Sequence, residues 1–154
     1  FLRRIGIEVV ATTLREETFL PGILVQHGRL FVDETKLTYP GDLLHEAGHL
    51  AVAPSHLRHQ LSGEIVIPGA DMNMVEVQAT AWAYAALKHL ELEPEILFHE
   101  AGYRGKSAGL IRTYGFGVYP GANLLEDLGM TLTKRRASES NLPAYPHMLR
   151  WLRE

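Results

Sequence analysis

The sequence predicts a mixed α+β fold that is mostly helical, with a small β-hairpin or sheet beside a helix carrying the pattern His-Glu-x-x-His. Three observations favour this fold. Helix-forming residues surround the pattern over residues 42–52, an apolar stretch of helical length runs from 72 to about 92, and two β-prone runs flank a glycine-containing turn over 22–33. The 154 residues, 46% of them hydrophobic, fit one domain over 1–154 with one core.

The first third of the chain is expected to contain a helix and then the hairpin. Apolar residues recur at helical spacing from 1 to about 14, which predicts an amphipathic first helix. The hairpin over 22–33 is expected to form a small sheet beside the histidine-bearing helix. An edge strand beside a cleft can hold an extended peptide by main-chain pairing, and a hairpin that simply covers the core is an equally good interpretation.

The histidine-bearing helix is expected to follow Pro40-Gly41 and to end at Pro54. Because residues four apart on a helix share one face, His45 and His49 can bind a single ion through their imidazole nitrogens. Glu46 lies about 100° round the helix from His45, too far to join both histidines as a ligand. It is well placed beside the open face of the ion, where it can accept a proton from bound water.

The rest of the chain is expected to be helical with one short strand. A strand is predicted at 64–67, within the connection to the longest helical stretch, and that stretch is apolar nearly all round, so it is predicted to be the central buried helix. The polar segment 134–140 is predicted to be a solvated loop. Glycine and proline divide the remainder into short predicted helices over 94–101, 106–114, 121–128 and 146–153.

A catalytic zinc usually has three protein ligands, and the absence of cysteine leaves histidine or a carboxylate as the third. Glu76 is the best candidate, because it is the only carboxylate in the central helix before its far end and an unpaired buried charge there would be costly. Pairing with Arg or Lys, or exposure to solvent, is the alternative. A metzincin pattern is absent, since the positions it requires hold Val52 and Ser55. Capping of the central helix explains Asp71 adequately.

The sequence His45-Glu46-x-Gly48-His49-Leu50, followed by Glu76-x-x-Ala79-Thr80-Ala81-Trp82-Ala83, resembles the ImmA/IrrE group of small zinc metallopeptidases. With the preceding hairpin, the similarity covers roughly residues 20 to 90. The resemblance implies a zincin-like domain with His45, His49 and Glu76 as zinc ligands and Glu46 as general base. No helix-turn-helix DNA-binding segment is visible.

The predicted function is zinc-dependent hydrolysis of a peptide or amide bond, in which Glu46 assists the attack of zinc-bound water. His99 and Tyr103 are candidate donors to the developing oxyanion. The alternative interpretation of the same stretch is a helix end, with Gly102 as C-cap and Tyr103 packed on it. Two alternatives are an inactive zinc-bound domain that senses a ligand or holds a partner protein, and a metal-free interaction module. Glu46 argues against the inactive domain, because a structural site needs no base.

Composition limits the expected partners. A net charge of −3 argues against an extended nucleic-acid or anionic-membrane surface, and no apolar run approaches the length of a membrane span. A peptide or protein substrate is therefore expected, and homo-oligomerisation stays open. The absence of cysteine excludes disulfides and makes a reducing cytoplasm the simplest expected location.

Overall fold

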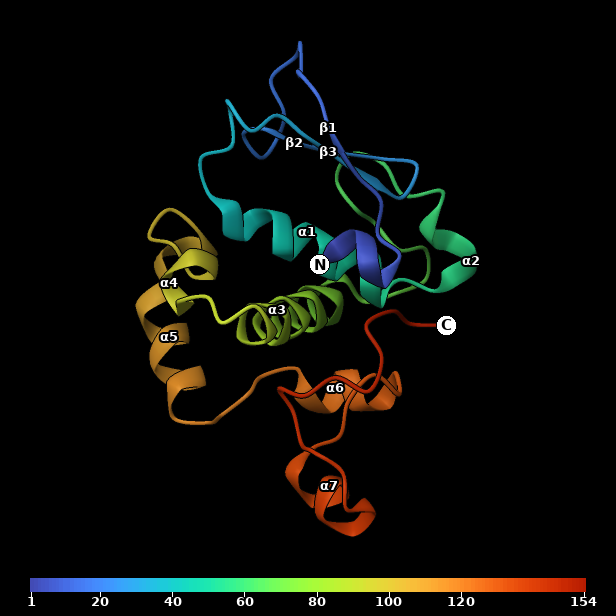
Figure 1. Ribbon diagram of the computed structural model, residues 1–154, viewed down its shortest axis with the longest axis vertical. Coiled ribbons are helices and arrows are strands. Elements are labelled where there is room, and N and C mark those ends of the chain that lie inside the picture. The colour runs from blue at the N-terminus through green and yellow to red at the C-terminus, as the bar shows by residue number, and fades with distance from the viewer.

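The computed structural model describes residues 1–154 and confirms the mixed α+β fold. A three-stranded sheet lies at one end of the molecule, the two longest helices lie beneath it, and the shorter helices lie beside these two or on the side away from the sheet (Figure 1). In chain order the elements are η1 (Leu2–Ile5), β1 (Val9–Ala11), β2 (Ile23–Gln26), β3 (Arg29–Val32), α1 (Pro40–Val52), α2 (Ser55–Arg58), α3 (Met72–His89), α4 (Pro94–Leu97), η2 (Tyr103–Gly105), α5 (Ser107–Gly115), α6 (Ala122–Asp127) and α7 (Lys134–Ser140).

The predicted hairpin is confirmed as β2 and β3, which pair antiparallel. Their two-residue turn is His27-Gly28, with φ of 51° and 71°. Positive φ at both turn positions matches the right-handed twist of the strands, and glycine takes the second position without steric cost. β3 is the central strand, because β1 pairs with its other edge in parallel.

The predicted amphipathic first helix is wrong. Only one 3-10 turn forms, and it ends at Gly6, which has φ of 96°. The following residues form β1, in which Val9 and Val10 pair with Leu30 and Phe31 of β3. β-branched side chains favour a pleated strand, so pairing with β3 overrides the helical spacing of the apolar residues.

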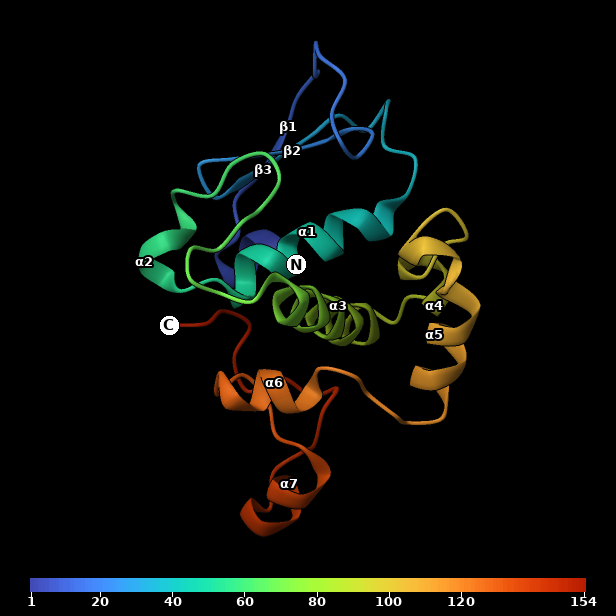
Figure 2. The same cartoon turned by 180° about the vertical axis from the view of Figure 1, so that it is seen from behind.

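The central helix is confirmed as α3, and it is buried over most of its second half, whereas Met74 and Val77 in its first half are exposed. It lies between α1 on one side and α6 on the other, as the view from behind also shows (Figure 2). Trp82 is fully buried, and its indole N–H donates to the carbonyl oxygen of Trp151 at 2.9 Å. None of the helices combines the length and the apolar composition that crossing a membrane requires.

Two predictions in the C-terminal half are wrong. The predicted loop over 134–140 forms α7, which buries Ala137 and follows Thr133, whose N–H and hydroxyl donate to the Glu126 carboxylate. The predicted helix over 146–153 does not form, because its main chain bonds to distant segments: the N–H of Leu149 donates to Met130 and that of Arg153 to Ala51.

The predicted strand over 64–67 is also wrong. Ile65 and Ile67 are buried and Val66 is exposed, so the alternation expected of a strand is present. No neighbouring strand pairs with this segment, however, and it stays an irregular connection between α2 and α3.

Candidate metal centre

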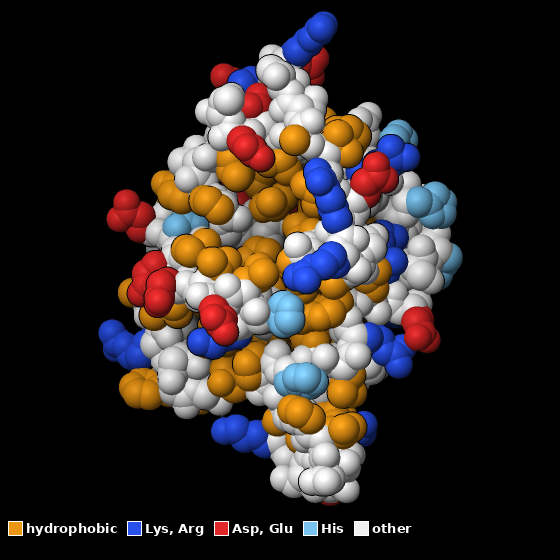
Figure 3. Space-filling view, viewed as in Figure 1, with side chains coloured by type: hydrophobic (Ala, Val, Ile, Leu, Met, Phe, Trp, Pro, Cys, Tyr) orange, Lys and Arg blue, Asp and Glu red, His pale blue; other side chains and the backbone are white.

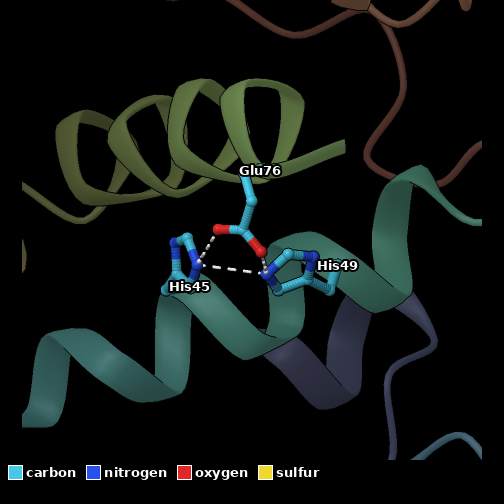
Figure 4. A group of neighbouring side chains, drawn as sticks. All are labelled: His45, His49 and Glu76. Atoms are coloured by element: carbon cyan, nitrogen blue, oxygen red, sulfur yellow. Dashed lines mark hydrogen bonds and ion pairs between the residues drawn. The ribbon is translucent and has the colours of Figure 1, made fainter. Parts of the chain in front are cut away.

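Two adjacent helices bring three potential metal ligands together. His45 and His49 lie one turn apart on α1, and Glu76 reaches toward them from the first half of α3 (Figure 4). The Nε2 atoms of the two histidines are 3.1 Å apart. Nε2 of His45 lies 3.3 Å from Oε2 of Glu76, and Nε2 of His49 lies 3.3 Å from Oε1. The donor atoms of these three side chains lie close enough together to hold one metal ion.

The three separations fit a tetrahedral ion. Zinc bonds to imidazole nitrogen and carboxylate oxygen are about 2.0–2.1 Å long, and a tetrahedron with such bonds has edges of about 3.3–3.4 Å. The observed edges of 3.1, 3.3 and 3.3 Å are within a few tenths of an ångström of that figure. The three donor atoms could therefore occupy three corners of a tetrahedron around one ion.

Gly48 allows this convergence. A β-carbon at this position would lie only 2.6 Å from the backbone carbonyl oxygen of Ala79, so α1 and α3 approach each other too closely for any side chain there. Gly48 lies between the two histidines in sequence, and Ala79 lies one helical turn after Glu76. The glycine that weakens α1 by propensity is thus required at the crossing that brings the carboxylate to the imidazoles.

The expected burial of Glu76 is wrong, although its position fits the predicted role. Its side chain is 55% exposed and faces a cleft, whereas the side chains of His45 and His49 are 17% and 5% exposed. Hydrogen bonds from His45 and then from His49 hold the pKa of the Glu76 carboxyl well below its usual range. Glu76 is therefore an ionised ligand candidate at neutral pH.

Glu46 lines the same cleft as the three ligand candidates without belonging to their group. Burial raises the pKa of its carboxyl to about 7, against the opposing effect of the nearby His45. The negative charges of Glu76 and Asp42 raise this pKa further. A carboxyl group in this range can accept and return a proton near neutral pH.

Ligating histidines usually donate from their second ring nitrogen to an acceptor, and no such hydrogen bond is found here. The Nδ1 atoms of His45 and His49 are both buried, and neither has a hydrogen-bond partner. The two rings instead pack edge to face, with centroids 4.7 Å apart. The contact between the two rings and the Nε2 contacts with the Glu76 carboxylate therefore orient the imidazoles, with no acceptor on the Nδ1 side.

The cleft above the metal centre has a volume of about 1120 Å³. Among its lining residues are exposed apolar side chains, notably Phe19, Val66 and Val77. Hydrophobic side chains gather around a hollow between the sheet and the helices on the face that Figure 3 shows. A group of three potential ligands that lines an open cleft can be reached by a peptide-sized molecule.

His99 and Tyr103 both line this cleft. Nε2 of His99 lies 2.9 Å from Oδ1 of Asp42, and Tyr39 stacks on its ring at a centroid distance of 3.8 Å. The Tyr103 ring lies edge to face with His45, with centroids 6.0 Å apart. The interpretation of Gly102 as a C-cap is wrong, because its φ of −91° is not left-handed.

Sequence reasoning missed Asp42 and Tyr39 as neighbours of the site. Asp42 precedes His45 by three residues, and this spacing, which places both on one face of α1, could have indicated it. Nothing in the sequence pairs Tyr39 with His99.

The edge of the hairpin is partly occupied by the chain itself. β2 is an edge strand, but its Val25 carbonyl oxygen accepts a hydrogen bond from the N–H of Gly63 at 2.8 Å. The N–H of Ile23 donates to Leu20 at 3.1 Å. The strand therefore both covers the core and borders the cleft, with only part of its edge left for another chain.

Neither the family models, nor the curated proteins, nor the solved structures contain a match to this chain. The geometry of the three donors and the chemistry of their neighbours therefore carry the functional argument. What the geometry establishes is a group of two imidazoles and one carboxylate that can hold a metal ion.

Proposed function

We propose that this protein is a zinc-dependent hydrolase, and most specifically a metallopeptidase that cleaves a peptide or amide bond in the cleft. The observation that carries the proposal is the triangle of His45, His49 and Glu76 donors with tetrahedral edge lengths. Two imidazoles and a carboxylate are a ligand set used by catalytic zinc, whereas magnesium and calcium select oxygen ligands.

The open fourth corner favours catalysis over a structural role. Structural zinc sites are usually closed by four protein ligands, and catalytic sites keep one position free for water or substrate. Here three side chains supply donors, and the neighbouring space is the cleft. The second candidate, an inactive zinc-bound domain that senses a ligand, has no use for the half-buried Glu46 beside the ligands.

The proposed chemistry divides between the ion and the chain. Bound zinc would polarise the substrate carbonyl and lower the pKa of water to near 7. Glu46 accepts the proton of the attacking water and passes it to the leaving amine, because its carboxyl borders the ligands without being one of them.

Of the two oxyanion candidates, Tyr103 has the better placement for donation. Burial raises the pKa of its hydroxyl far above the usual value, so the group stays protonated and can donate to an oxyanion. The Nε2 atom of His99 is already paired with Asp42, and its Nδ1 atom is buried without a partner. We therefore assign the donor role to Tyr103 and a supporting role to His99.

The first test is the metal content of the purified protein by elemental analysis, beside His45→Ala and Glu76→Ala. About one zinc per chain is expected in the wild type, with a large loss in both variants. His56→Ala is the matched control, because this exposed histidine lies on α2, outside the cleft. Zinc retained in Glu76→Ala at the wild-type level would refute the proposed third ligand.

Activity is then measured against a mixture of quenched fluorescent peptides. Glu46→Gln should bind zinc as the wild type does and lose most of its hydrolysis, because the amide cannot accept a proton. A Glu46→Gln protein that hydrolyses peptides at the wild-type rate would refute the mechanism. A zinc-loaded wild type that cleaves no peptide in a broad mixture would favour the inactive sensor.

A further inference from the structure

The first turn of α1 packs against α4 and against the residues that follow α4. A β-carbon on Gly41 would lie 1.9 Å from the backbone carbonyl oxygen of Ile96, so the two backbones touch at this point. One residue further along α1, Asp42 pairs with Nε2 of His99 at 2.9 Å across 57 positions of sequence. The helix that carries the candidate ligands therefore packs on the backbone of α4 and holds the start of the 99–107 segment through the polar pair.

The imidazole of His99 is held in a defined position. Tyr39 stacks on it with an interplanar angle of 6°. On Gly102, a β-carbon would lie 3.0 Å from Cε1 of the same ring, so the backbone of the segment folds directly against the imidazole. The side chains of His99 and Asp42 are only 10% and 17% exposed, and the pair is therefore largely shielded from solvent.

The backbone between His99 and Ser107 closes on itself around this ring. The Ser107 hydroxyl donates to the carbonyl oxygen of His99 at 2.6 Å, and the N–H of Gly102 donates to the same oxygen at 3.1 Å. Within this closed segment, Tyr103 and Arg104 have φ of 53° and 52°. Non-glycine residues seldom adopt this left-handed region, so surrounding contacts must hold them there.

This local structure orients the side chain of Tyr103. Its ring packs on Phe98 at 5.1 Å and edge to face with His45 at 6.0 Å. Tyr103 thus contacts a metal-ligand candidate, while the backbone that carries it rests on His99 and, through His99, on α1. The path from Asp42 to the tyrosine runs through directly contacting groups.

We propose that Asp42 and His99 are positioning residues, which fix the 99–107 segment so that Tyr103 faces the metal centre. The catalytic meaning of this arrangement rests on the proposed function, since Tyr103 serves there as the donor to the oxyanion. The structural part concerns only this chain's own residues and can be tested in the metal-free protein.

The test follows the ring of Tyr103 by ¹⁹F NMR in protein labelled with 3-fluorotyrosine. The resonance is assigned by its loss in Tyr103→Phe. In Asp42→Ala and His99→Ala it should shift or broaden, and Asp42→Asn should restore it, because the amide oxygen still accepts from the imidazole. Glu100→Gln is the matched control, since this neighbouring carboxylate is exposed and makes no contact with the pair.

Gly102→Ala provides a second route if the polar variants fold poorly. Its φ and ψ of −91° and 177° suit any residue, so the new methyl group displaces the His99 ring without straining the backbone. The Tyr103 resonance should move in this variant too. An unchanged resonance in Asp42→Ala, His99→Ala and Gly102→Ala would overturn the proposal, as would an equal shift in Glu100→Gln.

Activity measurements separate positioning from general support of the fold. With zinc loaded, His99→Ala should lower kcat about tenfold or more, the range for residues that orient catalytic groups, with little change in KM. In the Tyr103→Phe background the same substitution should have little further effect, because the two act through one group. Additive losses would overturn the proposal. If the wild type binds no zinc, the proposed function fails, and the ¹⁹F resonance still decides whether Tyr103 is positioned by the pair.

Discussion

The closest approach between α1 and α3 gives the sharpest prediction, for Gly48→Ala. In most helices this change is favourable, because alanine is the better helix former by about 1 kcal/mol. At this position the added methyl carbon would lie 2.6 Å from the backbone carbonyl oxygen of Ala79. A backbone group cannot rotate away as a flexible side chain can, so the two helices must move apart.

The size of that movement can be worked out from the contact. Ordinary van der Waals contact begins at 3.4 Å, so relief of the 2.6 Å contact requires an opening of about 0.8 Å. Metal sites tolerate deviations of only about 0.2 Å in ligand distance, and the opening moves Glu76 away from both histidines. Overpacking costs about 1–3 kcal/mol. After the gain in helix propensity, the expected net destabilisation is about 1 kcal/mol, or a fall of about 2–4 °C in Tm.

The assay is a zinc competition titration with a chromophoric chelator, together with thermal unfolding of the metal-free protein. Gly48→Ala should weaken zinc binding about tenfold or more and lower Tm. Gly109→Ala is the matched control, because this helical glycine of α5 has no atom within 4 Å of its added β-carbon. It should raise Tm and leave zinc affinity unchanged. A Gly48→Ala protein with raised Tm and wild-type zinc affinity would refute the role assigned to the crossing.

Three further predictions concern stability. Zinc at 100 times its Kd should stabilise the wild type by about 2.7 kcal/mol, which raises Tm by roughly 5–10 °C, and should not shift His45→Ala. Hydrogen bonds from Thr35 and then from Leu14 lower the pKa of the Asp33 carboxyl below its ordinary value of 3.8. The ionised carboxylate therefore stabilises the fold above pH 3.8, and this contribution is lost as the pH falls through the lowered pKa. The Tm deficit of Asp33→Asn against wild type, followed by calorimetry, should be full at pH 6 and shrink on acidification. Arg58→Met removes three hydrogen bonds to backbone carbonyl oxygens, at the end of α1 and near the C-terminus. It should lower the free energy of unfolding, measured with denaturant, by about 2 kcal/mol and leave the zinc affinity unchanged.

The parts of the fold that the sequence predicts well are those with a strong local signal. The helix with His45 and His49 is bounded by prolines, α3 is long and apolar, and the hairpin has a glycine in its two-residue turn. In each case the residues that decide the structure are neighbours in the chain. The sequence patterns of α1 and α3 together also lead to Glu76 as the third ligand candidate. The reason given for it is burial of an unpaired charge, and the structure does not support that reason.

The errors arise where distant contacts override local spacing. The apolar residues of 1–14 have helical periodicity, but pairing of β1 with β3 makes a strand of the middle of that segment. The segment 146–153 is predicted to be helical, but hydrogen bonds from its main chain to Met130 and Ala51 hold it in an irregular conformation. The pair formed by Asp42 and His99 spans 57 residues, so no local pattern can indicate it.

The same dependence on distant contacts bears on the candidate metal centre. α1 alone supplies only two donors, and the third requires the crossing at Gly48. At its first turn α1 is held by Ile96 and His99, and at its last turn the N–H of Arg153 donates to the Ala51 carbonyl. A helix fixed at both ends and in the middle cannot adjust its ligands freely when an ion or substrate arrives. The placement of the three donor atoms is then a property of the folded chain, which is what the proposed catalytic function requires and what a site that forms only around its ion does not have.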